Sequence, residues 1–215
     1  MILTKTKISE RIKTGSLKFS PELDSFQLRP HAVDLRLGYT FLIPKSWHLT
    51  PRGREALSID HFDKKRPEYF DVIELEQGQY FELLPGEYVI VSTLEKITMP
   101  RDIMAVLYPR SSVNRRGLSV DLTGIVDCGY EGQLAVPVRN NTGHQTIKLY
   151  PGERFCQVVF EKTGEEIIDI TNRYSKKDIV HGAIRSNPGL HGLDEEEIAL
   201  IQKGDIKGLK MKFKI

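Results

Sequence analysis

Short stretches of alternating apolar and polar residues recur along the chain as far as Phe160. In residues 30–38 the alternation puts Val33, Leu35 and Leu37 on one face of an extended strand, because successive side chains point to opposite faces. Further runs rich in β-branched and aromatic residues fall at 79–84, 88–92, 103–107 and 155–160. No helical period joins these runs, so the pattern predicts an all-β barrel or sandwich.

Turns with glycine and proline separate the predicted strands. The tripeptide Pro-Gly-Glu occurs at 85–87 and again at 151–153, each time before an apolar strand. Proline followed by glycine is typical of a type II turn. Residues 124–138 place a short polar turn with two glycines between two apolar runs, so we expect a β-hairpin whose tip carries Asp127 and Tyr130.

Helical signals are confined to the two ends of the chain. Thr4 is a candidate N-cap, and Gly15 is a stop signal. Between them, Ile8 and Ile12 are one helical turn apart. Residues 194–204 have an aspartate cap, an acidic first turn and a glycine stop. These patterns predict a short helix near each end.

The remaining polar stretches mark exposed or separate segments. Residues 44–69 are predicted to form an exposed excursion between strands, and residues 172–192 a loop. Apolar residues alternate with lysines over 209–215, which predicts a half-buried edge strand with a lysine face. We therefore expect a β-barrel domain over 1–171 and a C-terminal extension, or lid, over 172–215.

Composition narrows the class of protein. The chain has 215 residues, of which 40% are hydrophobic, and its net charge is only +2. No bulk field therefore drives it onto nucleic acid or a membrane. A charged-then-apolar leader and a long apolar run are both absent, so we expect a cytoplasmic protein. Its two cysteines, Cys128 and Cys156, indicate neither a disulfide framework nor a structural zinc, and we expect both to be small buried residues.

Candidate chemistry gathers in two stretches that carry cations, hydroxyls and an amide. The first stretch holds Arg110, Ser111, Ser112 and Arg115, and Gln157 lies in the second. Guanidinium and hydroxyl groups are what a polyanion needs, although the tripeptide Arg-Ser-Ser is by itself a weak signal.

Two carboxylates are further candidates. Asp127 on its turn can orient a water and accept its proton, although an aspartate that merely initiates a turn has the same pattern. Asp34 and Arg36 share the polar face of the strand at 30–38. From these residues alone, a surface ion pair and an active-site role are equally good interpretations.

These segments together resemble a known superfamily. Residues 110–112, 124–133 and 151–157 are similar, in content and in order, to the middle motifs of the dUTPase and dCTP deaminase superfamily, and residues 32–38 resemble its first motif. The resemblance implies a distorted jelly-roll barrel and a homotrimer with active sites between subunits. It also implies a deoxynucleoside triphosphate substrate with Mg²⁺ held mainly by the phosphates.

The resemblance also assigns roles to single residues. Asp127 would activate the water that attacks the α-phosphorus, and Tyr130 would pack against the sugar and exclude a 2′-hydroxyl. The other nucleotide-binding positions that it implies are Asp34, Arg110, Ser111, Ser112, Arg115, Val126 and Gln157. A degenerate match to the family's closing motif at 185–192 gives a candidate lid containing Arg185, Gly189 and Leu190.

The choice of reaction rests on one position. The family's deaminases lack zinc and use a glutamate five residues after the hairpin glycine, which corresponds here to Pro137. Proline has no ionisable group, so we predict a dUTPase that converts dUTP to dUMP and pyrophosphate.

Two alternatives stay open. One is a dCTP deaminase, or a bifunctional deaminase and dUTPase, which the deaminase-like N-terminal region, Arg115 and the nearby Glu131 favour. The other is a nucleotide-binding protein without catalysis, which the degenerate lid favours.

Overall fold

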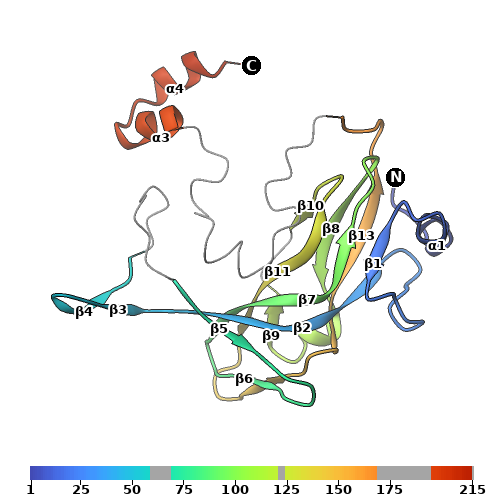
Figure 1. The fold of residues 1–215 in the computed structure, drawn as a ribbon, viewed down its shortest axis with the longest axis horizontal. Coiled ribbons are helices and arrows are strands. Elements are labelled where there is room, and N and C mark those ends of the chain that lie inside the picture. The colour runs from blue at the N-terminus through green and yellow to red at the C-terminus, as the bar shows by residue number, and fades with distance from the viewer. Residues whose placement is uncertain (59–68, 121–123, 169–194, 215) are drawn as a thin grey trace.

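Antiparallel strands build most of the computed structural model, which describes residues 1–58, 69–120, 124–168 and 195–214. Nine strands form one large sheet, in the order β10-β8-β13-β2-β7-β11-β9, with β1 added on β7 and β5 on β2. The sheet curls into a half-barrel (Figure 1). The strands are β1 (Lys18–Ser20), β2 (Val33–Pro44), β5 (Phe70–Glu74), β7 (Tyr88–Thr98), β8 (Ile103–Pro109), β9 (Leu118–Val120), β10 (Ile125–Val126), β11 (Glu131–Asn140) and β13 (Arg154–Lys162).

Two small antiparallel pairs complete the β-structure. β6 (Phe81–Leu83) pairs with β12 (Ile147–Leu149). β3 (Trp47–Thr50) pairs with β4 (Gly53–Ala56) in a hairpin that extends to one side in Figure 1. The expected excursion at 44–69 therefore contains a hairpin, while its residues 59–68 lie outside the described part of the chain.

One apolar core lies inside the curled sheet, and it includes Val33, Leu35 and Leu37 from β2 as predicted. The expected all-β barrel is thus confirmed. β2 and β7 approach each other closely at Gly38, where a Cβ atom would lie 2.2 Å from Ser92 Oγ. Glycine is required there because no side chain fits between the two backbones at that register shift.

The N-terminal helix α1 (Lys5–Lys13) begins and ends where the sequence predicts. Ile8 is fully buried, Ile12 packs against the core, and Gly15 has a φ of +71°. Thr4 occupies the N-cap position, but its side chain makes no capping hydrogen bond. Packing of the apolar face therefore holds this helix, rather than its cap.

The expected hairpin at 124–138 is wrong. β10 pairs with β8, whereas β11 pairs with β7 and β9, so the two apolar runs are not partners. The turn between them is bonded to a different connection, because Gly129 N donates to Pro100 O at 3.0 Å and Met99 N donates to Tyr130 O at 2.8 Å. Tertiary pairing therefore sends the two arms of the turn to different neighbours.

Two helices make up most of the described C-terminal segment. α3 (Glu195–Gln202) confirms the predicted helix, but α4 (Ile206–Lys212) replaces the expected edge strand at 209–215. Asp205 caps α4 by accepting a hydrogen bond from Gly208 N at 2.8 Å. An ion pair of 2.6 Å between Lys212 and Glu196 links the two helices. The apolar residues at 206, 209 and 213 have helical spacing. This spacing is compatible with α4, whereas the alternation of apolar residues and lysines over 209–215 had predicted a strand.

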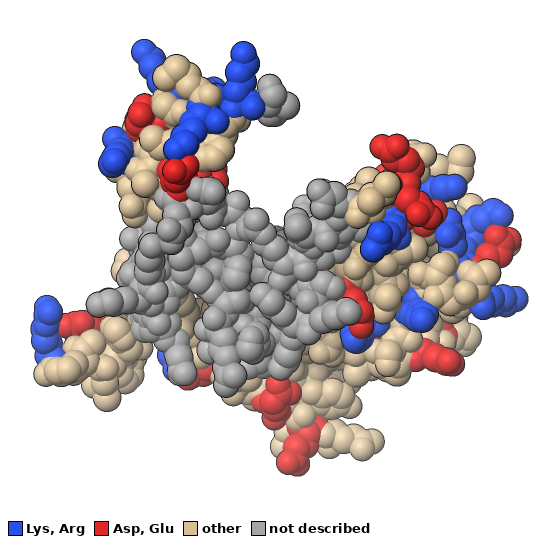
Figure 2. Space-filling view, turned by 45° about the horizontal axis from the view of Figure 1, so that its top comes forward, with Lys and Arg blue, Asp and Glu red and all other residues tan. Residues whose placement is uncertain are grey.

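The mixed signs of the surface charges and the burial of the two cysteines agree with the composition. Basic and acidic side chains are interspersed over the face seen in Figure 2. Cys128 and Cys156 are free and buried, as expected. None of the described helices is long and apolar enough to cross a membrane.

Candidate functional site

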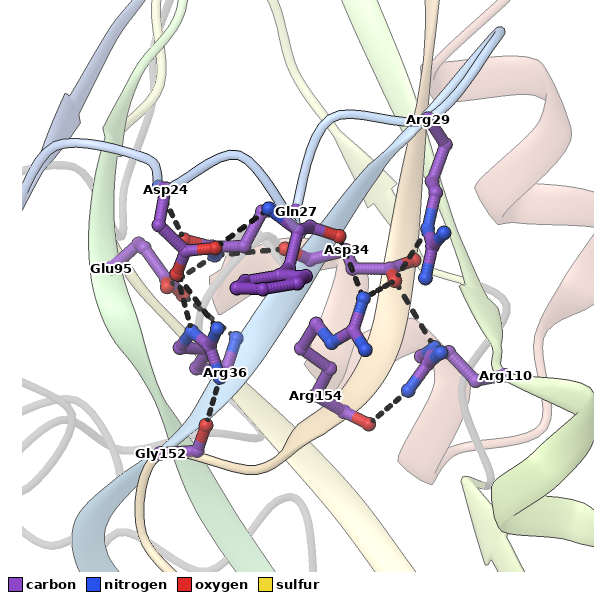
Figure 3. Close-up of polar contacts among 10 residues, drawn as sticks. Asp24, Gln27, Arg29, Asp34, Arg36, Glu95, Arg110, Gly152 and Arg154 are labelled. Carbon is purple, nitrogen blue, oxygen red and sulfur yellow. Dashed lines mark hydrogen bonds and ion pairs between the residues drawn. The ribbon is translucent and has the colours of Figure 1, made fainter.

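The buried carboxylate of Asp34 contacts three arginines (Figure 3). Asp34 is 1% exposed, and its Oδ2 lies 2.9 Å from Arg29 Nε, 3.2 Å from Arg110 Nε and 3.4 Å from Arg154 Nη1. One negative charge thus faces three positive charges, which leaves this cluster a surplus of positive charge. We call these four residues the arginine cluster.

Strand register brings the members of the arginine cluster together. Asp34 on β2 is the direct partner of Gln157 on β13, and Arg154 begins β13. Arg110 follows β8, which pairs with the other side of β13, and it is the N-cap of the short helix α2 (Ser111–Asn114). The strand order β8-β13-β2 therefore places residues that are distant in sequence around one carboxylate.

Backbone carbonyls fix the orientation of two of the guanidiniums. Arg110 Nη1 donates to Arg154 O at 2.8 Å, and Arg154 Nη1 donates to Phe26 O at 2.6 Å. Burial lowers the pKa of Arg110, with the neighbouring arginines acting in the same direction and Asp34 opposing them. The guanidiniums are therefore held in place before any ligand arrives, which is the condition for strong anion binding.

Further hydrogen bonds hold the backbone of Asp34, which belongs to the arginine cluster. Gln27 Nε2 donates both to Asp34 O at 2.9 Å and to Glu95 Oε1 at 2.7 Å, while Arg36 N donates to Glu95 Oε2 at 2.9 Å. Burial raises the pKa of Glu95, and these hydrogen bonds oppose the rise. The loop before β2 is thus tied to β7 directly behind Asp34.

The interpretation of Asp34 and Arg36 as a surface ion pair is wrong. Arg36 pairs instead with Asp24, with its Nη2 at 2.7 Å from Asp24 Oδ2, and it also donates to Gly152 O. Asp34 is buried and turned toward Arg29, Arg110 and Arg154. The alternation placed both residues on one face, but only the neighbouring strands decided their partners.

The hydroxyls and the cation of α2 face solvent. Ser111, Ser112 and Arg115 are exposed on a helix that follows Arg110 directly. Arg116, next to them, pairs with Glu153 at 3.3 Å. Ser111, Ser112 and Arg115 therefore occupy exposed positions directly after Arg110 of the arginine cluster.

The turn after β10 holds the other predicted residues. Asp127 is exposed, whereas Val126 is buried and 4% exposed, so Val126 can contact a nucleotide only through its backbone. The Tyr130 hydroxyl donates to Gln133 O at 2.7 Å, and burial raises the pKa of Tyr130 to about 12. Its ring is thus held in place by its own strand.

Within one subunit, Asp127 lies far from the arginine cluster. Val126 is the register partner of Ala105 near the start of β8, whereas Arg110 follows the end of that strand. At roughly 3.3 Å per residue of strand, the backbones of Asp127 and Arg110 are about 15–20 Å apart along β8. A general base and a phosphate site at this separation cannot serve the same phosphate.

Several residues at the site carry no sequence signal. Arg29, Gln27 and Glu95 lie in stretches without a motif, and only their burial and contacts reveal them. The candidate lid residues Arg185, Gly189 and Leu190 lie outside the described part of the chain. Within the described residues, no group of three or more His, Cys, Asp or Glu side chains is placed to hold a metal ion.

Two similar proteins from different organisms carry the same name. A protein of Dictyoglomus thermophilum named "dCTP deaminase, dUMP-forming" is 38% identical over 164 residues, which are 75% of this chain and 80% of that protein. One of the same name from Methanosphaera stadtmanae is 35% identical over 162 residues, covering 74% of this chain and 78% of that protein.

A solved structure supports the fold. The dCTP deaminase of Agrobacterium tumefaciens aligns with a TM-score of 0.56 at 23% identity, covering 76% of this chain. This chain spans 49% of that longer protein. The jelly-roll type of barrel, with short helices, is therefore confirmed.

These relatives contradict the prediction of a plain dUTPase. That prediction rested on the absence of a carboxylate at Pro137, yet relatives at 31–38% identity are named dCTP deaminases that form dUMP. A single missing group excludes a reaction only if no other group can replace it, and the sequence could not establish that condition. The alternative of a deaminase fits the relatives better, and an enzyme is supported.

The superfamily resemblance is confirmed over most of the chain. A family model described as "dCTP deaminase-like" matches residues 2–163. This range includes the arginine cluster, α2 and the Asp127 turn. The chain therefore belongs to the dCTP deaminase-like family, within the dUTPase and dCTP deaminase superfamily.

Proposed function

We propose that this protein converts dCTP to dUMP, releasing ammonia and pyrophosphate. The arginine cluster is the observation that carries this proposal, together with the shared name of the relatives. Three guanidiniums around one buried carboxylate leave a surplus of positive charge, which suits the several negative charges of a triphosphate. The exposed hydroxyls of Ser111 and Ser112 and the cation of Arg115 extend this surface.

The hydrolytic half of the reaction needs a base and a means of balancing phosphate charge. Asp127 is exposed on its turn and can accept a proton from an attacking water. Mg²⁺ usually keeps several waters and binds substrate phosphates instead of an all-protein cage. A site with few protein carboxylates fits that habit, so we propose that the triphosphate supplies most of the ligands to Mg²⁺.

The deaminating half needs a group that carries protons between water and the cytosine ring. Pro137 is paired with Ile90 of β7 and cannot supply one. The carboxylates on the neighbouring turn and strand start are Asp127, which is exposed, and Glu131, which pairs with Lys96 at 2.7 Å. We place the proton transfer on one of these two carboxylates.

A homotrimer would solve the separation between Asp127 and Arg110. If each active site takes the arginine cluster from one subunit and the Asp127 turn from another, both groups can reach one nucleotide. We therefore propose a trimer with shared sites. The test is to mix inactive Asp127→Asn and inactive Arg110→Ala subunits and let them reassemble. Partial recovery of activity is expected, because some mixed sites are complete, and no recovery would place each site within one subunit.

The reaction itself is tested by following two products. Purified protein is incubated with dCTP and Mg²⁺, and ammonia and pyrophosphate are measured together, with dUTP as a second substrate. Both products from dCTP are expected, with dUMP as the nucleotide. Glu131→Gln and Asp127→Asn then distinguish the proton carriers. Pyrophosphate without ammonia, or nucleotide binding without any product, would overturn the proposal.

A further inference from the structure

A cavity of about 650 Å³ lies beside α1 and β1, and the loop between β1 and β2 contributes to its lining. Its floor consists of apolar side chains, two of them buried: Leu17, which is 0% exposed, and Phe19, which is 7% exposed. Ile12, Leu23 and Leu28 complete the apolar lining. This size is within the roughly 300–1,000 Å³ of ordinary small-molecule sites.

Lysines surround the cavity, and their charge is not neutralised locally. Lys5, Lys13 and Lys18 belong to its lining, and none of them forms an ion pair with any residue of the described segments. Of the two acidic residues in the lining, Asp24 is already paired with Arg36 at 2.7 Å, which leaves Glu22. The cavity therefore combines an apolar floor with a net positive rim.

We propose that this cavity binds a small organic anion with an apolar body. The carboxylate or phosphate of such a ligand would meet the lysines, and its apolar part would lie against Leu17 and Phe19. Neither part alone fits the lining, because a simple inorganic anion leaves the apolar floor exposed and a neutral apolar molecule leaves the lysines unmatched. An acyl-chain carboxylate and a nucleoside monophosphate both have this chemistry.

The wall of the cavity connects it to the arginine cluster. Asp24 and Leu28 line the cavity, and between them Gln27 holds both Asp34 O and Glu95. A ligand in the cavity would therefore contact the same loop that carries Gln27. We infer that occupation of the cavity changes the affinity for nucleotide. This coupling rests on the proposed function, whereas binding in the cavity does not.

Binding is tested with anilinonaphthalene sulfonate, a fluorescent amphipathic anion, in the absence of nucleotide. The double variant Lys13→Glu/Lys18→Glu is expected to weaken binding at least about tenfold, through loss of two attractive charges and gain of two repulsive ones. Leu23→Trp, which places a larger side chain inside the lining, is expected to weaken binding as well. Lys7→Glu is the matched control, because Lys7 lies on α1 but outside the lining. Equal loss in the control, or unchanged binding in the double variant, would overturn the proposal.

Competition identifies the kind of ligand. Decanoate and dUMP are each titrated against the bound dye in the wild type and in Arg110→Ala, whose arginine cluster is damaged. Displacement by decanoate alone assigns an acyl carboxylate, and displacement by dUMP that persists in Arg110→Ala assigns a nucleotide. Displacement by neither would refute the cavity's assignment.

The coupling is measured separately, as the KM for dCTP with and without the displacing ligand. A change in KM that the double lysine variant loses supports the inferred link. An unchanged KM in an active enzyme would refute the link. If the protein lacks activity but still binds the dye in a lysine-dependent way, the proposed reaction is refuted and the proposed anion site in the cavity is supported.

Discussion

Asp34 Oδ2 lies 3.2 Å from Arg110 Nε, and this carboxylate is 1% exposed while the Arg110 side chain is 21% exposed. The acid is thus inside the protein and its partner reaches toward the surface. This arrangement fixes the guanidinium without enclosing it, so that a phosphate can approach from the solvent side. The carboxylate is best understood as a positioning residue for the arginine cluster.

Replacing Asp34 by asparagine should reduce stability and weaken nucleotide binding together. Three guanidiniums would lose the buried carboxylate that they share, and breaking a fully buried pair costs about 3–5 kcal/mol. Because the arginine side chains are 21–40% exposed, we expect a smaller loss of about 1–3 kcal/mol in the free energy of unfolding, measured with urea. Asp24→Asn, at a more exposed pair, is the control and should lose less. Equal losses would contradict the central role of Asp34.

Replacing Asp127 by asparagine should stop chemistry and leave the fold intact. Loss of a positioned general base lowers turnover by roughly 10²–10⁴-fold. Because Asp127 is exposed, the substitution should change the protein's free energy of unfolding by no more than about 0.5 kcal/mol. Formation of dUMP and nucleotide binding are measured for the variant and for the remote control Glu10→Gln. Wild-type turnover in Asp127→Asn would place the base elsewhere.

Tyr130 should select against ribonucleotides through its ring rather than through its hydroxyl. Its hydroxyl is bonded to Gln133 O, which holds the ring in place. A 2′-hydroxyl buried without a partner costs about 1–3 kcal/mol, so kcat/KM for dCTP should exceed that for CTP by about tenfold to a hundredfold. Tyr130→Ala should narrow this ratio, while Tyr130→Phe should largely keep it. A ratio unchanged by the alanine variant would show that Tyr130 is only a core residue.

Glu95 should make the protein less stable as the pH rises. Its pKa in the folded protein is raised above the usual 4.5, chiefly by burial. Above pH 4.5 the unfolded chain ionises this group while the folded chain still resists ionisation, so the free energy of unfolding falls until the pH passes the raised pKa. Urea denaturation at several pH values should show this fall in the wild type relative to Glu95→Gln. Parallel pH profiles for the two proteins would rule out the effect.

Both cysteines should resist thiol reagents in the native protein. Burial raises the pKa of Cys128, with the charges of Asp127 and Asp102 adding to the rise, and Cys156 is 0% exposed with a pKa well above its usual value. The thiolate is the reactive form, so little of it exists near neutral pH. An aromatic disulfide reagent should label neither thiol in buffer and both in denaturant. Rapid labelling of the native protein would contradict the buried environment.

Local sequence determined most of the strands and the N-terminal helix. Alternation in β2 and the glycine stop after α1 are short-range effects, since they depend on side-chain period and on the backbone freedom of Gly15. Nucleotide chemistry was indicated by the family resemblance of the segments that contain Arg110, Asp127 and Gln157, because these residues alone were ambiguous. None of these conclusions requires knowing which strands are neighbours.

Only the tertiary structure decided the partners. The two runs around Asp127 read as a hairpin, but hydrogen bonds to the β7–β8 connection separate them. A surface ion pair between Asp34 and Arg36 was one of two open interpretations, yet Asp34 pairs with Arg29, Arg110 and Arg154. At 209–215 the capping by Asp205 and the packing of α4 against α3 overrode an alternating pattern. Pairing between distant segments depends on the free energy of the whole sheet, which local periodicity alone does not determine.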